Sequence, residues 1–386
     1  MKKTTSHLYL IVLLSILSSV APMGVDTYLP SIPDIALAFS VSIEKIELSL
    51  SIFLIGFSVG QIFGGPISDK YGRKMSSVYG LLGFAFFSFV IIFSTTIYEL
   101  WFFRFFEAFC GGIVVVNAAA AVRDRFHGVE AAKVFSLIGM VRSLAPLIAP
   151  AIGAFIIHFY SWKAIFIFLT LYALVVAFFI YRDLEESFTY SKQNVLESFK
   201  TVLSHKSALK AMLVLGFSFG GFFIIIAKTS FIYIEYFKIT TDYFPLFFGI
   251  NFIVLMLMIK INVNLLKRFN PISLVKMAVL VQIISGGLLA LNYENISLLL
   301  TIILIASYMS MMAFIFGNCM AMTLEHFPKN AGVASGVVGV VQFGLGAIIS
   351  SIALIYHDGT IFPIGISVCL ISIVAFLIIR NYKYNV

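Results

Sequence analysis

Long apolar stretches alternate with short polar segments along the whole chain. The first six lie near residues 8–36, 46–68, 75–94, 97–122, 131–158 and 162–181, and the other six lie near 207–234, 243–266, 271–292, 296–324, 331–356 and 360–380. A helix needs about 20 apolar residues to cross the hydrocarbon layer of a membrane, and only helices satisfy the backbone of such continuous segments in lipid. β-Barrel strands, about ten residues long with alternating polarity, do not fit. The pattern therefore predicts twelve membrane-spanning helices.

Composition narrows the picture to an integral membrane protein. Of 386 residues, 61% are hydrophobic and only 11% are charged, with a mean hydropathy of +1.04. A water-soluble fold cannot bury that share of apolar residues. Nucleic-acid binding, a disulfide scaffold and a large aqueous catalytic domain therefore fit the sequence poorly, and the lipid bilayer is the expected environment. Cys110, Cys319 and Cys369 lie inside apolar runs and are interpreted as small buried hydrophobic residues.

The apolar stretches form two sets of six. The longest polar stretch separates them, and we expect an N-terminal bundle at 1–182, a linker at 183–206 and a C-terminal bundle at 207–386. An amphipathic piece, Asn194–Leu203, suits the membrane surface. Residues 131–154 align weakly with 331–354 at an offset of 200. The sequence thus predicts an all-α fold of two six-helix bundles with pseudo-two-fold symmetry, which is typical of parallel-repeat secondary transporters.

The distribution of basic residues predicts orientation. When loops are assigned alternately to two sides, 19 Lys and Arg fall on one side and three on the other. Basic loops face the cytoplasm, so both termini are expected there. Lys2 and Lys3 before an apolar run resemble a signal peptide, but the run continues past the possible cleavage site through Pro22, Asp26 and Pro30. We expect no cleavage.

One loop carries a specific motif. Between spans 2 and 3 the chain reads Gly65-Pro66-Ile67-Ser68-Asp69-Lys70-Tyr71-Gly72-Arg73-Lys74, which resembles the loop signature of the major facilitator superfamily. Gly65 is expected to let two helices approach closely and Gly72 to permit a tight turn. Asp69 is expected to accept hydrogen bonds from a facing helix N-terminus or to pair with Arg123. Alternatively, Lys70, Arg73 and Lys74 only enforce the orientation.

Further motifs resemble the Bcr/CflA branch of drug:proton antiporters. These are Asp26–Pro33 in span 1, Arg104–Glu107 in span 4, Ala145–Gly153 with Pro146, Pro150 and Gly153 in span 5, Gly216–Phe219 and Phe231–Glu235 in span 7, and Phe327–Gly332. The resemblance implies efflux across the bacterial cytoplasmic membrane, driven by inward proton flow without a bound cofactor. The span 5 prolines weaken the helix and suit either a hinge or a static kink.

Three ionisable residues are expected to meet inside the first bundle. Asp26 and Arg104 lie at matching depths in their spans, at about 1.5 Å per residue, and Glu107 lies one turn from Arg104. Charges at membrane depth are functional candidates. We predict that Asp26 carries the proton and that Arg104 tunes it or holds the helices. A static buried ion pair is the alternative.

Other charges bear on the substrate. Glu107 stands where the branch has Gln, and Arg142 and Lys228 are additional cations at membrane depth. If all face the cavity, the balance favours an anionic or zwitterionic metabolite or a siderophore-like carboxylate over the amphipathic drugs of the branch. Alternatively, Lys228 pairs with Asp26 or Glu107, or Arg142 faces a helix contact. The expected wall residues near these charges are Tyr28, Phe222 and Tyr233.

Other classes of protein fit less well. The six His lie in or near loops, so no nucleophile–base pair or metal cluster is visible at membrane depth and no enzyme is expected. No phosphate-binding motif indicates ATP. No ring of like charges indicates a channel, and a retinal-type role for Lys228 conflicts with twelve spans. We expect a monomer whose partners are protons and a small-molecule substrate.

Overall fold

The computed structural model describes residues 7–126, 128–186, 195–294, 296–327, 331–356, 358–380 and 382, and its described part contains helices and no strands. The chain divides into two compact units, Met1–Gln193 and Asn194–Val386, so the division falls within the expected linker at 183–206.

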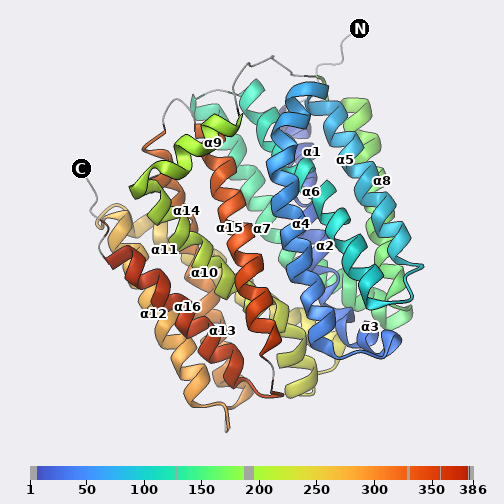
Figure 1. The fold of residues 1–386 in the computed structure, drawn as a ribbon, viewed down its shortest axis with the longest axis vertical. Helices are drawn as coiled ribbons and strands as arrows, with labels where there is room; N and C mark the ends of the chain where they lie inside the picture. The colour runs from blue at the N-terminus through green and yellow to red at the C-terminus, as the bar shows by residue number, and fades with distance from the viewer. Residues whose placement is uncertain are drawn as a thin grey trace. The chain divides into compact units, whose positions relative to one another are not determined.

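The first unit contains the N-terminal helices (Figure 1). They are α1 (His7–Ser18), α2 (Val20–Asp26), the 3-10 turn η1 (Leu29–Ser31), α3 (Ile32–Phe39), α4 (Ile43–Tyr71), α5 (Arg73–Ile91), α6 (Ile97–Arg125), α7 (Gly128–Phe159) and α8 (Lys163–Asp183). The most extensive packing joins α4 to α6 and α5 to α6. Thr96 begins α6 with a capping box, in which its side chain accepts from the Glu99 amide and the Glu99 carboxylate accepts in return.

The second unit contains the remaining elements. They are α9 (Val195–Ser204), α10 (Lys206–Ser230), the π-helical turn η2 (Phe231–Tyr236), the 3-10 turn η3 (Thr241–Tyr243), α11 (Phe244–Leu265), α12 (Pro271–Leu291), α13 (Leu298–Ser310), α14 (Met312–Leu324), α15 (Ala331–Ile355) and α16 (Phe362–Arg380). The amphipathic piece expected at 194–203 corresponds to α9, which packs against α10 and α15.

The helices agree with the predicted spans. Ten helices in the described part are long and apolar enough to cross a membrane, and the number is eleven when α1 and α2–α3, bent by 42° to each other, are counted as one span. The fifth predicted span corresponds to α7, whose described apolar part is Leu144–Phe159. The tenth predicted span is interrupted at Met311, between α13 and α14.

Glycines set the contact between α4 and α6. A Cβ at Gly56 would lie 2.2 Å from the Phe105 carbonyl oxygen, and one at Gly60 would lie 2.1 Å from that of Phe109. From the first contact to the second, the residue number rises by four in both helices, so the two helices run parallel. Small residues allow membrane helices this backbone contact, which holds α6 and its charged residues close to α4.

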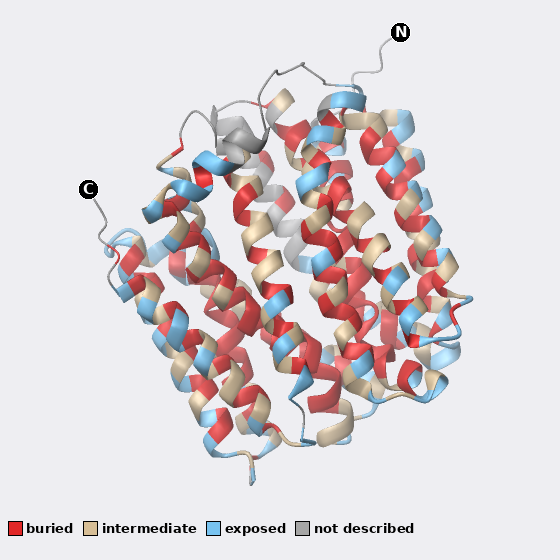
Figure 2. Ribbon diagram, viewed as in Figure 1, coloured by how far each residue is buried: buried red, intermediate tan, exposed pale blue. Residues whose placement is uncertain are grey.

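Burial follows the pattern of a membrane bundle. Within each unit, buried residues face neighbouring helices and many exposed positions alternate with them along the same helix (Figure 2). Large apolar side chains such as Phe86, Phe155 and Leu257 are among the exposed ones. Exposed apolar faces of this extent are what lipid-facing helices present.

Candidate functional site

The first span is irregular next to Asp26. Helix α2 ends at this residue, and η1 follows before α3 begins. The Tyr28 amide donates to Val25 O (3.2 Å), so it does not form the regular helical bond to the Gly24 carbonyl. Pro30 has no N–H to offer the Asp26 carbonyl. The break therefore leaves the Gly24 and Asp26 carbonyls, beside an acidic side chain, without their regular helical hydrogen bonds.

Asp26 is 4% exposed. No residue in the described part donates a hydrogen bond to its carboxyl group or forms an ion pair with it. A buried acid normally has such a partner because an isolated buried charge is costly. An acid of this kind at membrane depth is a candidate for proton exchange.

Arg104 lies in α6 and is fully buried. Its Nη1 donates to the Gly24 carbonyl at 3.1 Å and to Glu107 Oε2 at 2.8 Å. The rings of Tyr28 and Phe53 lie 4.6 and 4.4 Å from the guanidinium carbon, within the range of a cation–π interaction. Arg104 Nε and Nη2 make no hydrogen bond within the described part. The guanidinium thus joins α6 to the break in the first span.

Glu107 completes the pair. It is fully buried, its Oε2 accepts from Arg104, and its Oε1 accepts from Ser88 Oγ at 2.6 Å. The pair spans α6 positions three apart, on one face of the helix. The structure therefore brings Arg104 and Glu107 together and places Asp26 nearby without a bond to either. Ser88, on α5, was not singled out from the sequence, because nothing along the chain shows which hydroxyl meets Glu107.

Tyr28, expected in the cavity wall, packs inside the first unit. Its side chain is fully buried, and its hydroxyl hydrogen-bonds with Ser49 Oγ at 3.0 Å. Its ring also packs edge-on against Phe166 at 5.9 Å. The position beside Arg104 gives it a role in holding the guanidinium.

The expected substrate residues of the second unit are also buried. Lys228 lies in the last turn of α10, is 2% exposed, and has its Nζ 5.5 Å from the Phe231 ring. Tyr233 lies in η2 with its ring against Phe247, and Phe222 lies in α10. A lysine is almost never buried without a compensating environment. Arg142 is placed in α7, but its side chain lies outside the described residues.

The signature segment (Gly65–Lys74) turns as expected at Gly72, whose φ of +85° suits glycine. Arg73 Nε pairs with Asp124 at 3.0 Å, and its Nη1 donates to Ser68 Oγ at 2.6 Å. The Nζ of Lys70 and of Lys74 lie about 5 Å from the rings of Tyr71 and Tyr181, respectively. The side chains of Asp69 and Arg123 lie outside the described residues.

The close helix approach expected of Gly65 is not seen among the described residues of the first unit. A Cβ at Gly65 would meet no described atom within 4 Å, whereas one at Gly64 would lie 3.1 Å from Ile113 Cα. The close approach to α6 is therefore made by Gly64. Adjacent helix positions point about 100° apart, and the chain alone does not show which of two neighbouring glycines faces the partner helix.

Two acidic residues that the sequence analysis missed hold the same end of the first unit. Asp124 pairs with Arg73, and the Glu186 carboxylate accepts from the backbone amides of Arg73 (2.7 Å) and Lys74 (3.2 Å). These amides begin α5, where a helix N-terminus favours negative charge. Acidic residues close to a basic loop are the signal that could have found them.

Arg125 strengthens this contact. It donates a hydrogen bond to the Glu185 carbonyl, in the segment that follows α8. Burial lowers the pKa of Arg125, and the neighbouring acids oppose that shift. The residues after α8 are thereby attached to both α5 and α6.

The expected antiporter segment lies in α7. Pro146 and Pro150 are both inside the helix, and Gly153 faces the break in the first span, where a Cβ would lie 2.2 Å from Thr27 O and 3.2 Å from Pro30 Cγ. The segment therefore packs next to Asp26.

One further buried acid escaped the sequence analysis. Glu47, near the start of α4, is fully buried. From the α4–α6 register, Glu107 is level with residue 58, so Glu47 lies about 16 Å away along the helix axis. It belongs to the opposite end of α4 from the signature segment.

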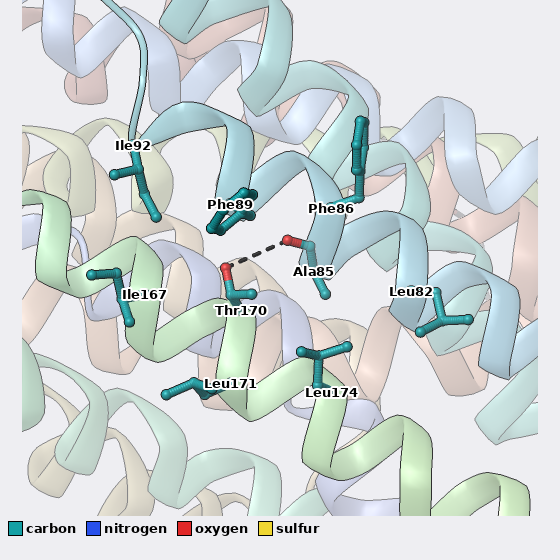
Figure 3. A pocket seen from close by; sticks show the side chains of 9 residues that line it. All are labelled: Leu82, Ala85, Phe86, Phe89, Ile92, Ile167, Thr170, Leu171 and Leu174. Carbon is teal, nitrogen blue, oxygen red and sulfur yellow. Dashed lines mark hydrogen bonds between the residues drawn. The ribbon is translucent and has the colours of Figure 1, made fainter.

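The described residues hold no candidate metal site, and the surface groove lies away from Asp26, Arg104 and Glu107. Within the described residues, no group of three His, Cys, Asp or Glu could hold a metal ion. A groove of about 600 Å³ lies between α5 and α8, as Figure 3 shows. Its lining is apolar apart from Thr170, whose hydroxyl donates to the Phe166 carbonyl at 2.7 Å and also lies 3.4 Å from the Ala85 carbonyl. Phe86 and Leu171 in this lining are more than half exposed, as lipid-facing side chains are.

Helices of membrane length, an interrupted first span and buried ionisable residues define a multi-pass membrane transporter. A family model described as Major Facilitator Superfamily matches residues 14–351, and the chain belongs to that superfamily. The fold predicted from the sequence is thereby confirmed.

Individual relatives agree with the branch expected from the motifs. The chain is 32% identical to the bicyclomycin resistance protein homolog of Haemophilus influenzae, over 99% of each chain. It is 25% identical to the multidrug resistance protein MdtL of Klebsiella pneumoniae, covering 83% of this chain and 82% of that protein. Among solved structures, a D-xylose–proton symporter matches with a TM-score of 0.78 over 98% of both chains at 16% identity, which shows the shared fold.

Proposed function

We propose that the protein exports small amphipathic compounds of the antibiotic type by alternating access and that protons moving inward drive the export. The observation that carries the proposal is Asp26, a buried acid at a break in the first span that has no counter-ion among the described residues. The printed names of two relatives, which refer to bicyclomycin resistance and multidrug resistance, support the drug-like substrate.

Proton exchange at Asp26 supplies the coupling. The carboxylate accepts a proton from the outer side, and the neutral acid no longer pays the cost of a buried charge when the helices close around it. Opening to the inner side lets the carboxyl group release the proton to water. Each charge that crosses the membrane contributes about 2.3 kcal/mol per 100 mV, so the membrane potential also drives the cycle.

The basic loops and the bacterial relatives support the cellular setting that belongs to this proposal. The protein resides in a bacterial cytoplasmic membrane with both termini in the cytoplasm, and it works as a monomer. It needs no bound cofactor because the proton gradient is the energy source. Substrate, protons and lipid are its partners.

The decisive experiment compares Asp26→Asn with Asp34→Asn in purified, reconstituted protein. Asp34 belongs to the same span but is exposed, so it is the matched control. Asp26→Asn should abolish both substrate-induced proton release and transport driven by an imposed pH gradient, whereas Asp34→Asn should retain both. Unaltered proton release from Asp26→Asn would refute the proposal. So would uphill transport that persists after the pH gradient and the membrane potential are both collapsed.

A second candidate function is export of an anionic or zwitterionic compound by the same mechanism. Lys228 favours it, because this cation is 2% exposed in α10 beside the π-helical turn η2. Turns of this kind are frequent at functional sites, and a buried ammonium group is a natural partner for a carboxylate.

Competition assays separate the two candidates. Matched anionic and cationic compounds should be tested against wild type and Lys228→Gln. A preference for anions that weakens in Lys228→Gln supports the second candidate. A preference for cations that Lys228→Gln leaves unchanged rules it out.

A further inference from the structure

A buried arginine near the proton-carrying acid creates an electrostatic problem. Arg104 is fully buried and is anchored through Nη1 to the carbonyl of Gly24, two residues before Asp26. A positive charge close to a carboxyl group favours its ionised form. If nothing compensated Arg104, its charge would tend to hold Asp26 deprotonated and would weaken proton binding.

Glu107 supplies the missing compensation. Its Oε2 accepts from Arg104 Nη1 at 2.8 Å, and its Oε1 is held by Ser88 Oγ at 2.6 Å. Both oxygens are engaged, and the residue is fully buried. The carboxylate that neutralises Arg104 is therefore held by α5 and α6, whereas Asp26 on α2 has no such bond within the described part.

Few other charges act on this pair. The Tyr28 hydroxyl and the Cys110 thiol lie close enough to Glu107 to interact with its charge. The ionisable side chain that α2 contributes is Asp26 itself. Helix α5 contributes the neutral Ser88, and its own basic residues, Arg73 and Lys74, lie about 20 Å farther along the helix.

The other neighbours of α6 are α1, α4 and α7. The described charged side chains of α4 lie near its two ends, Glu44, Lys45 and Glu47 at the start and Lys70 at the end, each about 16 Å or more from Glu107 along the axis. Tyr9 is at the far end of α1 from the pair, where it bonds Asp183. The Arg142 side chain of α7 lies outside the described residues. Among the described residues, Glu107 is thus the group placed to balance Arg104.

We propose that Glu107 is a positioning residue that neutralises Arg104 and thereby leaves Asp26 free to bind and release its proton. This inference rests on the proposed proton-coupled function, because it concerns the pH at which Asp26 exchanges its proton. It assigns Glu107 a fixed negative charge and no proton transfer of its own.

The test measures the pH midpoint of substrate-induced proton release in purified protein. Glu107→Gln keeps a hydrogen-bonding side chain but leaves Arg104 uncompensated, so the midpoint should fall by about one pH unit, equal to about tenfold weaker proton binding. Arg104→Gln leaves Glu107 uncompensated and should raise the midpoint. The double variant Arg104→Gln/Glu107→Gln removes both charges and should return it close to wild type. The number of protons released per substrate should stay unchanged throughout.

The outcomes are distinct. A midpoint that stays at the wild-type pH in Glu107→Gln overturns the inference, and so does loss of proton release in that variant, which would make Glu107 a carrier. If Glu107→Gln does not fold, Arg104→Gln and the double variant decide: equal midpoints in these two overturn the inference. Asp26→Asn tests the proposed function separately, since a variant that still releases protons refutes Asp26 as carrier whatever Glu107→Gln does.

Discussion

Gly153 of α7 lies directly against the backbone of Thr27, the residue after Asp26. A Cβ at this glycine would be 2.2 Å from the Thr27 carbonyl oxygen, closer than any real contact. The last residue of the antiporter-like segment therefore sets how closely α7 approaches the break in the first span.

Gly153→Ala should displace the break. Because the obstructing atom is backbone, the new methyl group cannot be accommodated by a rotamer change, and overpacking of this kind costs about 1–3 kcal/mol. We expect a lower thermal denaturation midpoint in detergent and reduced transport. Gly317→Ala is the control, since a Cβ there meets no described atom within 4 Å. A Gly153→Ala protein as stable and active as wild type would show that the contact is not required.

The Arg73–Asp124 pair should contribute measurably to stability. Arg73 Nε lies 3.0 Å from Asp124 Oδ2, and the two side chains are only 12% and 16% exposed. Water therefore screens this pair less than it screens a surface pair. A double-mutant cycle with Arg73→Ala and Asp124→Ala should give a coupling energy of about 1 kcal/mol. The same cycle on Arg182 and Asp183, where the arginine is 54% exposed, should give a value near zero. Equal coupling in both cycles would contradict the prediction.

Glu186 should protect the start of α5. Its carboxylate accepts from the amides of Arg73 and Lys74, and an anion at a helix N-terminus stabilises it by about 0.5–1 kcal/mol. Glu186→Gln should therefore accelerate hydrogen exchange at these two amides about two- to fivefold. Glu185→Gln is the matched control, because Glu185 acts through its backbone carbonyl. Exchange that is unchanged in Glu186→Gln would rule out this cap.

His326 should make the second unit sensitive to acid. Burial lowers the pKa of His326, and the neighbouring His205, whose ring lies 4.3 Å away, lowers it further. As the pH falls, His326 is thus protonated at a higher pH in the unfolded chain than in the folded chain. The contribution of His326 to the free energy of unfolding is therefore fully present above its unfolded pKa of about 6.5 and declines as the pH falls through that value.

Thermal denaturation between pH 8 and pH 5 measures this effect. The midpoint of wild type should fall as the pH decreases, and His326→Gln should fall less steeply. An unchanged slope in His326→Gln would contradict the predicted linkage.

Hydropathy was enough to predict most helices, because a segment in lipid has no alternative to satisfying its own backbone. The Arg104–Glu107 pair could also be predicted from the sequence, since residues three apart share a helix face. Gly24, which Arg104 contacts, and Ser88, which Glu107 contacts, could not be predicted from the sequence, because they come from helices whose rotation depends on packing. The same limitation explains why Gly65 was chosen and its neighbour Gly64 was missed.

The sequence by itself determined a membrane protein of many spans, its superfamily, and the acid, base and glycine positions that mark the first unit. Only the tertiary structure decided that Arg104 bonds Glu107 and the Gly24 carbonyl, that Asp26 has no counter-ion within the part of the chain that the structure describes, and that Glu186 caps α5. Helix formation in lipid depends on each segment's own composition. Pairing of buried charges depends on which faces meet, and that depends on side chains far apart in the chain.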